Sequence, residues 1–414
     1  MYSSAVGVNG PVRYSVKNTD GTATDKATIE ESTGRLTALK PGQIKIRATY
    51  TGAPYIWSWT ATIEESMEGT WFIQNRHESL YMQVDDDDEP NYTNDGGIAE
   101  VRSFNGADYQ KWIFTNAGDG YYKITSKISG YAVTVPSGEE TEEDVDLVLK
   151  PYTGSNNQKW KITLTSYGSY KIKAKSSESI TDRDLVMVVQ TNILYSEGLN
   201  IQQRQYVDNT SYKDEWILHK QQDYTLMYIG YSVGDPEMPP IVNTVSSKLK
   251  TNAGMKGYEY TSLTNKELLV HLSSTSIFSC ITHGLQTQIT TTDGALTVSD
   301  INSLSSSAFD DLKFVYLGAC YTGQGGSGAN NLVNAVYNKG ADAVLGFKTE
   351  IFVSEANSWT KEFMSALSEG KTLREAMQDA DDAIRNDGKI VVPYYSTGEA
   401  YRYLVGSNQL IPCN

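Results

Sequence analysis

The chain has few of the residues that build metal sites and disulfide frameworks. Its 414 residues include only 3 cysteines and 4 histidines, against 28 tyrosines and 7 tryptophans. The cysteines are Cys280, Cys320 and Cys413, and none belongs to a Cys-x-x-Cys motif, so a structural zinc site is implausible. Three thiols allow one disulfide at most, which excludes a disulfide-stapled fold. If a cysteine and a histidine do chemistry together, they form one of only twelve pairings.

Basic residues and long apolar runs are also scarce. There are 35 Lys and Arg against 50 Asp and Glu, and the formal net charge of −15 argues against a nucleic-acid-binding protein. No apolar run approaches the ~18 residues that span a bilayer. The first residues lack the charged and apolar segments of a signal peptide. We therefore expect no transmembrane segment, and either a cytosolic protein or an internal piece of a longer secreted chain.

Three regions differ in their residue pattern, which predicts a multidomain protein. Residues 1–66 alternate apolar and polar side chains over 43–48 and 57–63, as half-buried strands do. A Lys-Pro-Gly turn precedes the first of these runs. The pattern predicts a small β-sandwich.

Residues 67–221 contain an internal repeat. The motif Gln110-Lys111-Trp112 recurs as Gln158-Lys159-Trp160, with a degenerate third copy, Asp214-Glu215-Trp216. A strand-like alternation of apolar residues follows each copy. Three such units around one axis would each bury a tryptophan in a shared core.

After about residue 222 strands alternate with helices. Short apolar runs at 226–230, 277–282, 312–317 and 341–347 are predicted strands. Apolar residues at helical spacing lie among them, and Thr372 with Glu375 forms a capping box that opens one predicted helix. We predict that residues 222–414 form an α/β domain with a mostly parallel sheet flanked by helices.

Two of these strands end in residues that can do chemistry together. The strand predicted over 277–282 ends at His283-Gly284, and the next one leads to Cys320. Functional residues of open α/β sheets lie at the carboxyl ends of the strands, so we expect His283 and Cys320 at one edge. An imidazole can take the proton of a thiol or lower its pKa. The amides of Gly284 and Cys320 are candidate donors of an oxyanion hole.

Residues 222–414 resemble the clan CD cysteine peptidases, the caspase, gingipain, clostripain and separase-like group. The resemblance rests on a strand ending in His-Gly, then a strand ending in Ala-Cys, with the Cys 37 positions after the His. It implies a polypeptide substrate and a Cys-His dyad that passes through a thioester acyl-enzyme. In that dyad His283 is the general base and acid, Cys320 is the nucleophile, and the Gly284 amide binds the oxyanion.

One position departs from the clostripain-like pattern. Those members carry an Asp two residues before the nucleophile, linked to a preference for basic residues before the cut. This chain has Gly318 there, so the preference does not carry over. Asp235 is an alternative acid for a substrate pocket, although an Asp in Gly-Asp-Pro is more often a turn residue.

Residues 67–221 resemble a ricin-type β-trefoil lectin domain, whose mark is a thrice-repeated Gln-x-Trp. In sugar-binding members an Asp lies upstream of this motif and an Asn directly precedes it. The upstream positions here are Gln83, Thr134 and Met187, and the preceding ones are Tyr109, Asn157 and Lys213. No repeat keeps both residues, which leaves Asn157 and Gln158 as carbohydrate-site candidates. Surplus Tyr and Trp could stack on sugars elsewhere, although buried aromatics are commoner.

Residues 1–66 resemble a bacterial Ig-like domain of the group 2 type. The resemblance rests on Gly34-Arg-Leu-Thr-Ala-Leu-Lys-Pro-Gly42 and the alternating strand that follows. Such domains are spacers on secreted or surface bacterial proteins. This favours a secreted or cell-surface location and an internal piece of a longer chain.

The other candidate residues have structural explanations. Cys280 lies three positions from His283 on the same strand, so it faces the opposite side and we expect it in the core. Cys413, near the terminus, is expected to have no role. The acidic run Asp85 to Glu89 could bind calcium, although a solvated loop is the better explanation. We therefore predict no metal site and no cofactor.

Three functions fit these patterns. The first is a secreted or surface cysteine endopeptidase with a lectin-like targeting module. The second is a non-catalytic adhesin with an inactive caspase-like domain. The third is a glycan binder that carries the enzyme as cargo.

Overall fold

The protein is described by a computed structural model, which falls into two compact units, Met1–Glu68 and Gly69–Asn414. The structure describes residues 12–39, 42–50, 56–63, 66–77, 79–85, 95–180, 182–190, 197–207, 213–228, 245–247, 249–251, 255–351, 353–386 and 402–406.

The described part of the first unit is built from short strands. An antiparallel sheet consists of β1 (Val12–Asn18), β4 (Gly42–Tyr50) and β5 (Ile56–Ile63), and β2 (Ala27–Ile29) pairs with β3 (Leu36–Ala38). Alternation along β4 directs Ile44 and Ile46 into a small core with Ala27. The strands predicted over 43–48 and 57–63 are confirmed.

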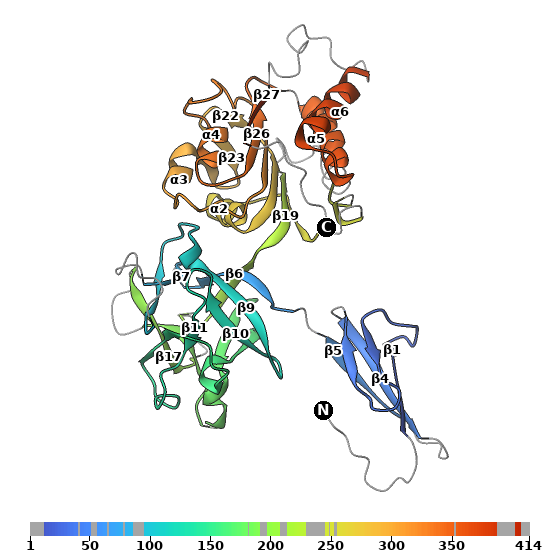
Figure 1. Ribbon diagram of the computed structural model, residues 1–414, viewed down its shortest axis with the longest axis vertical. Coiled ribbons are helices and arrows are strands. Elements are labelled where there is room, and N and C mark those ends of the chain that lie inside the picture. The colour runs from blue at the N-terminus through green and yellow to red at the C-terminus, as the bar shows by residue number, and fades with distance from the viewer. Residues whose placement is uncertain are drawn as a thin grey trace. The chain divides into compact units, whose positions relative to one another are not determined.

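In the β-rich region of Figure 1 that contains β6, β9 and β10, six strands of the second unit pair into a closed barrel. They are β6 (Gly69–Asn75), β9 (Lys111–Gly118), β10 (Tyr121–Ser126), β14 (Trp160–Leu164), β15 (Tyr170–Ala174) and β18 (Trp216–Lys220). Each strand pairs antiparallel with the next, and β18 pairs with β6. The ring therefore has no free edge, which removes the exposed hydrogen-bonding groups of an open sheet.

Three two-stranded pairings accompany the barrel, one in each repeat. They join β7 (Tyr81–Val84) to β8 (Ala99–Arg102), β11 (Ala132–Thr134) to β13 (Val148–Lys150), and β16 (Leu185–Val189) to β17 (Leu199–Gln205). The short β12 (Val145–Asp146) pairs with β17, and 3-10 turns cover Asp108–Gln110, Asn156–Gln158 and Lys175–Ser179.

The repeated tryptophans occupy equivalent positions in the barrel. Trp112, Trp160 and Trp216 are at most 1% exposed, and their indole N–H groups donate to the carbonyls of Met82, Val133 and Met187 at 3.0, 2.9 and 3.0 Å. This threefold geometry confirms that the repeats share one core. Gln83 and Thr134, the upstream positions of the first two repeats, each directly follow the residue whose carbonyl accepts the indole N–H. The equivalent upstream position of the third repeat is therefore Val188, and not Met187 as the sequence predicted, because the repeats differ in length.

The second sheet of this unit is mostly parallel, as predicted. Its order is β20 (Gly257–Tyr260), β19 (Gln222–Tyr228), β21 (Thr275–Ile281), β25 (Phe314–Gly318), β26 (Ala343–Phe347) and β27 (Arg402–Gly406). Neighbours pair in parallel except β27, which lies antiparallel on β26 at the edge.

Helices cover both faces of this sheet (Figure 1). One face carries α2 (Asn265–Ser273), α3 (Val298–Asn302) and α4 (Leu332–Tyr337), and the other carries α5 (Val353–Ser368) and α6 (Leu373–Asn386). Along β25, Tyr316 packs against Trp359 of α5, while Leu317 belongs to the cluster on the opposite face. The predicted capping box before α6 is present, because the Thr372 and Glu375 side chains each accept the other residue's N–H.

Charged contacts within the second unit join the barrel to the parallel sheet. The Lys111 ammonium, on a side chain only 1% exposed, lies 2.8 Å from Asp311 and 3.1 Å from Asp108. Lys127 lies 2.7 Å from Asp311. Burial would raise the pKa of Asp311, but Lys111 and Lys127 hold it below its usual value. The Asp311 carboxylate is therefore charged at neutral pH and links both lysines of the barrel to the sheet.

An apolar cluster lies at the same junction. Phe72 and Tyr81 of the barrel region pack with Val270 of α2, and the Phe104 ring packs against those of Phe72 and Tyr81. A Cβ at Gly106 would lie 2.7 Å from the Ser273 hydroxyl, so only glycine allows this approach. The first repeat thus provides the contact surface for α2.

Candidate active site

His283 and Cys320 follow two paired strands at the same offset. In the parallel pairing of β21 with β25, Ile281 lies opposite Gly318. His283 comes two residues after Ile281, and Cys320 comes two residues after Gly318. Since adjacent strands lie about 4.8 Å apart, both residues leave the sheet as neighbours at its carboxyl edge.

Gly284 brings the loop after His283 against the segment that carries Cys320. A Cβ at Gly284 would lie 2.8 Å from the Ala319 Cβ and 2.9 Å from the Cys320 carbonyl oxygen. No side chain fits that space, so the close approach requires glycine. Packing between the two strand ends thus explains the glycine of the His-Gly pair.

A hairpin holds the main chain of His283. The strands β22 (Gly284–Leu285), β23 (Gln288–Thr291) and β24 (Gly294–Thr297) form a small antiparallel sheet. The Thr290 N–H donates to the His283 carbonyl at 2.8 Å. Burial lowers the pKa of His283 below 6.5, because the imidazolium loses solvation. The ring is therefore mostly neutral at neutral pH, which is the form a general base needs.

The Cys320 sulfur contacts the main chain of Ile351. The Ile351 N–H donates to Sγ at 3.4 Å, and the thiol donates to the Ile351 carbonyl at 3.6 Å. Cys320 is partly exposed and forms no disulfide with Cys280. Sequence reasoning missed Ile351, because a main-chain donor has no residue-type signature.

The chain turns sharply after Cys320. Tyr321 has a φ of +62°, which residues other than glycine rarely adopt, and its N–H donates to the Thr349 carbonyl at 3.1 Å. The buried Thr322 hydroxyl accepts the Phe347 N–H at 3.3 Å. Such a backbone persists only where its surroundings hold it. Here two hydrogen bonds to β26 and the residues after it do so.

Side-chain amides order the glycine-rich loop 323–328. Asn331 donates to the carbonyls of Gln324 and Gly326 at 3.0 and 3.2 Å. Asn334 donates to the Gly326 carbonyl at 2.8 Å. Asn331 and Asn334, at the N-terminal end of α4, therefore hold the loop that follows Cys320.

The other candidates lie away from this edge or outside the described residues. Cys280 is fully buried, as predicted, and burial raises the pKa of its thiol to about 12. Asp235 and Cys413 lie outside the described residues, as does the acidic run beyond Asp85. No cluster of three or more His, Cys, Asp or Glu residues suited to a metal ion occurs in the described part of the chain. No described helix combines the length and apolarity needed to cross a membrane.

The carbohydrate-site candidates are buried inside the barrel domain. Asn157, 7% exposed, donates to the Val135 carbonyl at 2.7 Å. Gln158, 2% exposed, donates to the Thr134 hydroxyl at 3.1 Å and to the Pro151 carbonyl at 2.9 Å. Both amides therefore hold the second repeat together.

Family models match both parts of the second unit. Residues 57–149 and 108–185 match the model described as ricin-type beta-trefoil lectin domain-like, and residues 247–399 match the CHAT domain. The chain thus carries a trefoil lectin-like domain followed by a caspase-like CHAT domain. No curated protein matches the chain.

Several solved structures are similar to part of this chain. The designed threefold symmetric protein ThreeFoil is 28% identical, with 36% of this chain and 98% of that chain covered and a TM-score of 0.32. An exo-beta-1,3-galactanase from Clostridium thermocellum is 22% identical, covering 46% of this chain and 33% of that chain, with a TM-score of 0.31. Polyporus squamosus lectin is 12% identical, with 47% of this chain and 69% of that chain covered and a TM-score of 0.31.

Proposed function

We propose that the chain is a secreted or surface cysteine endopeptidase with Cys320 as nucleophile and His283 as general base. The observation that carries the proposal is the common offset of these residues beyond the paired Ile281 and Gly318. The close packing of Gly284 on the Cys320 main chain supports it. So does the caspase-like class of the domain around them.

The reaction needs only groups at this edge and one water molecule. His283 accepts the Cys320 proton, and the sulfur attacks the carbonyl carbon of a peptide bond. The Gly284 and Cys320 amides donate to the oxyanion that forms. His283 then protonates the departing amine, which leaves a thioester. Water attacks the thioester with His283 as base, releasing the carboxyl product and restoring the thiol.

The other parts of the chain serve delivery in this proposal. The trefoil domain is a lectin-like module that targets the enzyme to glycans. Residues 1–66 are a bacterial Ig-like spacer before it. Asp235 remains our candidate for an acidic side chain in the substrate pocket.

Replacing each cysteine in turn tests the nucleophile. We expect Cys320→Ala to abolish peptide cleavage and covalent labelling by a thiol-reactive peptide electrophile. Cys280→Ala is the matched control, since that thiol is fully buried with a raised pKa, and both activities should persist. Cleavage by the Cys320→Ala variant at the parent rate would overturn the proposal.

The alternative function is a non-catalytic adhesin with an inactive CHAT domain. The observation that favours it is the pairing of the Cys320 sulfur with both main-chain groups of Ile351. The same assays separate the two functions. A parent protein that binds glycans, cleaves no member of a peptide library and takes no label at Cys320 would be an adhesin.

A further inference from the structure

The third repeat has an acidic residue at the middle position of the motif, where the other two have a lysine. The middle residue of the motif is Lys111 in the first repeat and Lys159 in the second, but Glu215 in the third. Lys111 binds Asp311 of the CHAT domain. Glu215 has the opposite charge and is only 2% exposed. A buried carboxylate needs nearby hydrogen-bond donors or a cation to offset its lost hydration.

Three side chains surround the buried Glu215 carboxylate. The Arg76 guanidinium donates to it at 2.6 Å and the Tyr206 hydroxyl at 3.2 Å. The Ser169 hydroxyl, from the turn between β14 and β15, is a third donor. Glu215 thus fixes the turn and Tyr206 relative to each other, although they are far apart in the sequence.

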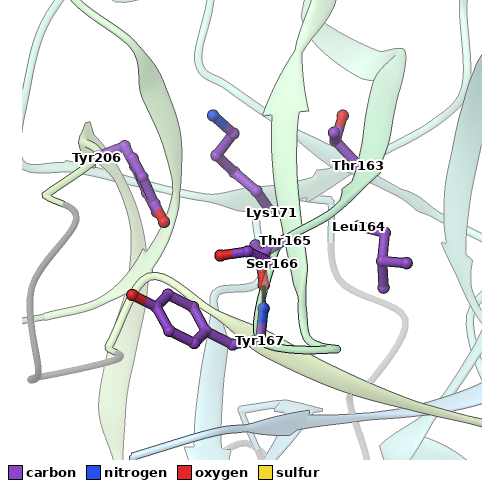
Figure 2. Close-up of a pocket in the computed structure, with 7 residues that line it drawn as sticks. All are labelled: Thr163, Leu164, Thr165, Ser166, Tyr167, Lys171 and Tyr206. Atoms are coloured by element: carbon purple, nitrogen blue, oxygen red, sulfur yellow. Dashed lines mark hydrogen bonds between the residues drawn. The ribbon is translucent and has the colours of Figure 1, made fainter.

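An open cavity of about 160 Å³ lies between these elements (Figure 2). Its lining comes from the β14–β15 hairpin and from the residue that follows β17, namely Thr163, Leu164, Thr165, Ser166, Tyr167, Lys171 and Tyr206. A cavity of this size suits one terminal unit of a ligand and not an extended chain.

The turn presents an aromatic ring at the cavity in a fixed position. Tyr167 is 55% exposed, and the Arg76 guanidinium lies 5.0 Å from its ring centroid. Thr165 and Ser169 close the turn through a main-chain bond of 2.8 Å and a hydroxyl contact of 2.9 Å. Gly168, with φ of +80°, allows the tight bend. A ligand therefore meets a preorganised surface, which lowers the entropy cost of binding.

The charges around the cavity are compensated. Arg76 is paired with Glu215, and the Lys171 ammonium lies 2.5 Å from Asp184. A cavity with paired cations has no excess charge to attract an anion. Hydroxyls beside an exposed aromatic ring instead suit a neutral polyol with an apolar ring face.

We propose that this cavity, which we call the hairpin site, binds a neutral terminal sugar residue of a glycan. The upstream positions that hold the sugar-binding Asp in related lectins are closed here, since Gln83, Thr134 and Val188 are at most 5% exposed. The sugar ring stacks on Tyr167, and its hydroxyls bond Lys171 and the threonines of the hairpin. This inference rests on the glycan-targeting part of the proposed function.

Glycan binding by the full chain tests the hairpin site. The protein is applied to an array of neutral, sulfated and sialylated glycans, and the best soluble neutral oligosaccharide is then titrated calorimetrically. We expect neutral glycans to bind and Tyr167→Ala to weaken binding by about tenfold or more. Tyr152→Ala is the matched control, because Tyr152 is 37% exposed with Lys123 at 5.2 Å from its ring. It should keep parental affinity.

Several outcomes would overturn the hairpin site. They are binding of no glycan, binding of anionic glycans alone, and equal losses in the two tyrosine variants. Peptide cleavage measured on the same samples separates this failure from that of the peptidase. If the parent protein cleaves peptides through Cys320 but binds no glycan, the hairpin site is refuted and the proposed active site is retained.

Discussion

At the scale of single residues, Gly284 determines how closely the two strand ends pack, and His283 carries the titratable group beside them. Gly284 lets the two strand ends touch, and the missing Cβ is what brings the His283 loop against the main chain of Cys320. The partial burial that results lowers the pKa of His283. The packing at this edge therefore also affects the protonation of the proposed general base.

The pH dependence of cleavage should report the lowered pKa of His283. A base works in its neutral form, so activity is lost as pH falls through the pKa of the folded protein. Because burial depresses that pKa, we expect the acid limb of kcat/KM to have its midpoint below pH 6.5. His77→Ala, at an exposed histidine of the trefoil domain, should leave the midpoint unchanged. A midpoint above pH 6.5 would contradict this assignment.

At the scale of elements, β26 and the residues after it support the segment that carries Cys320. Phe347 donates its N–H to Thr322, Thr349 accepts from Tyr321, and Ile351 meets the Cys320 sulfur. A Cβ at Gly346 would lie 2.5 Å from the Thr322 hydroxyl, so this strand also passes close to the turn. The segment that carries the proposed nucleophile is therefore positioned by a strand that holds none of the predicted catalytic residues.

Removing the Thr322 hydroxyl should weaken this support. Thr322→Val keeps the shape but takes the acceptor from the Phe347 N–H, and an unsatisfied buried donor costs about 1–3 kcal/mol. Urea unfolding should show a midpoint lowered accordingly with an unchanged slope. Thr349→Val, at an exposed hydroxyl, is the control and should change stability by less than about 0.5 kcal/mol. Equal midpoints for the two variants would refute the role of Thr322.

At the scale of the whole molecule, the first trefoil repeat and the CHAT domain form one packed unit. Lys111, Lys127 and Asp311 provide the charged part of the junction, and the cluster around Phe72 provides the apolar part. Two histidines lie near it, and burial lowers the pKa of His219 and of His271 to about 4. Both are neutral at neutral pH, so they place no unpaired charge inside the molecule.

The Lys111–Asp311 pair should contribute strongly to stability. Asp311→Ala leaves a lysine that is 1% exposed without its closest carboxylate, and breaking a buried pair in this way costs about 3 kcal/mol or more. Asp342→Ala is the matched control, since Asp342 pairs at 3.1 Å with the exposed Lys313. That loss should be below about 1 kcal/mol. Chemical unfolding of both variants measures the difference, and similar costs would contradict the buried junction.

Local periodicity was enough to predict several of the strands and helices. The alternation in 43–48, the thrice-repeated tryptophan and the strands ending at His283 and Cys320 are each visible within a few residues. Burial of one face imposes a period of two on strands, so these patterns survive whatever the distant partners are. The position of Val188 was missed by one residue, because the repeats differ in length.

The sequence by itself determined the repeats, the parallel sheet and the edge at which His283 and Cys320 lie. Only the tertiary structure decided that the Ile351 amide meets the sulfur, that Lys111 binds Asp311, and that Glu215 organises a cavity. Each of these contacts joins residues far apart in the chain. Whether such groups meet depends on how whole elements pack, and no local pattern encodes that packing.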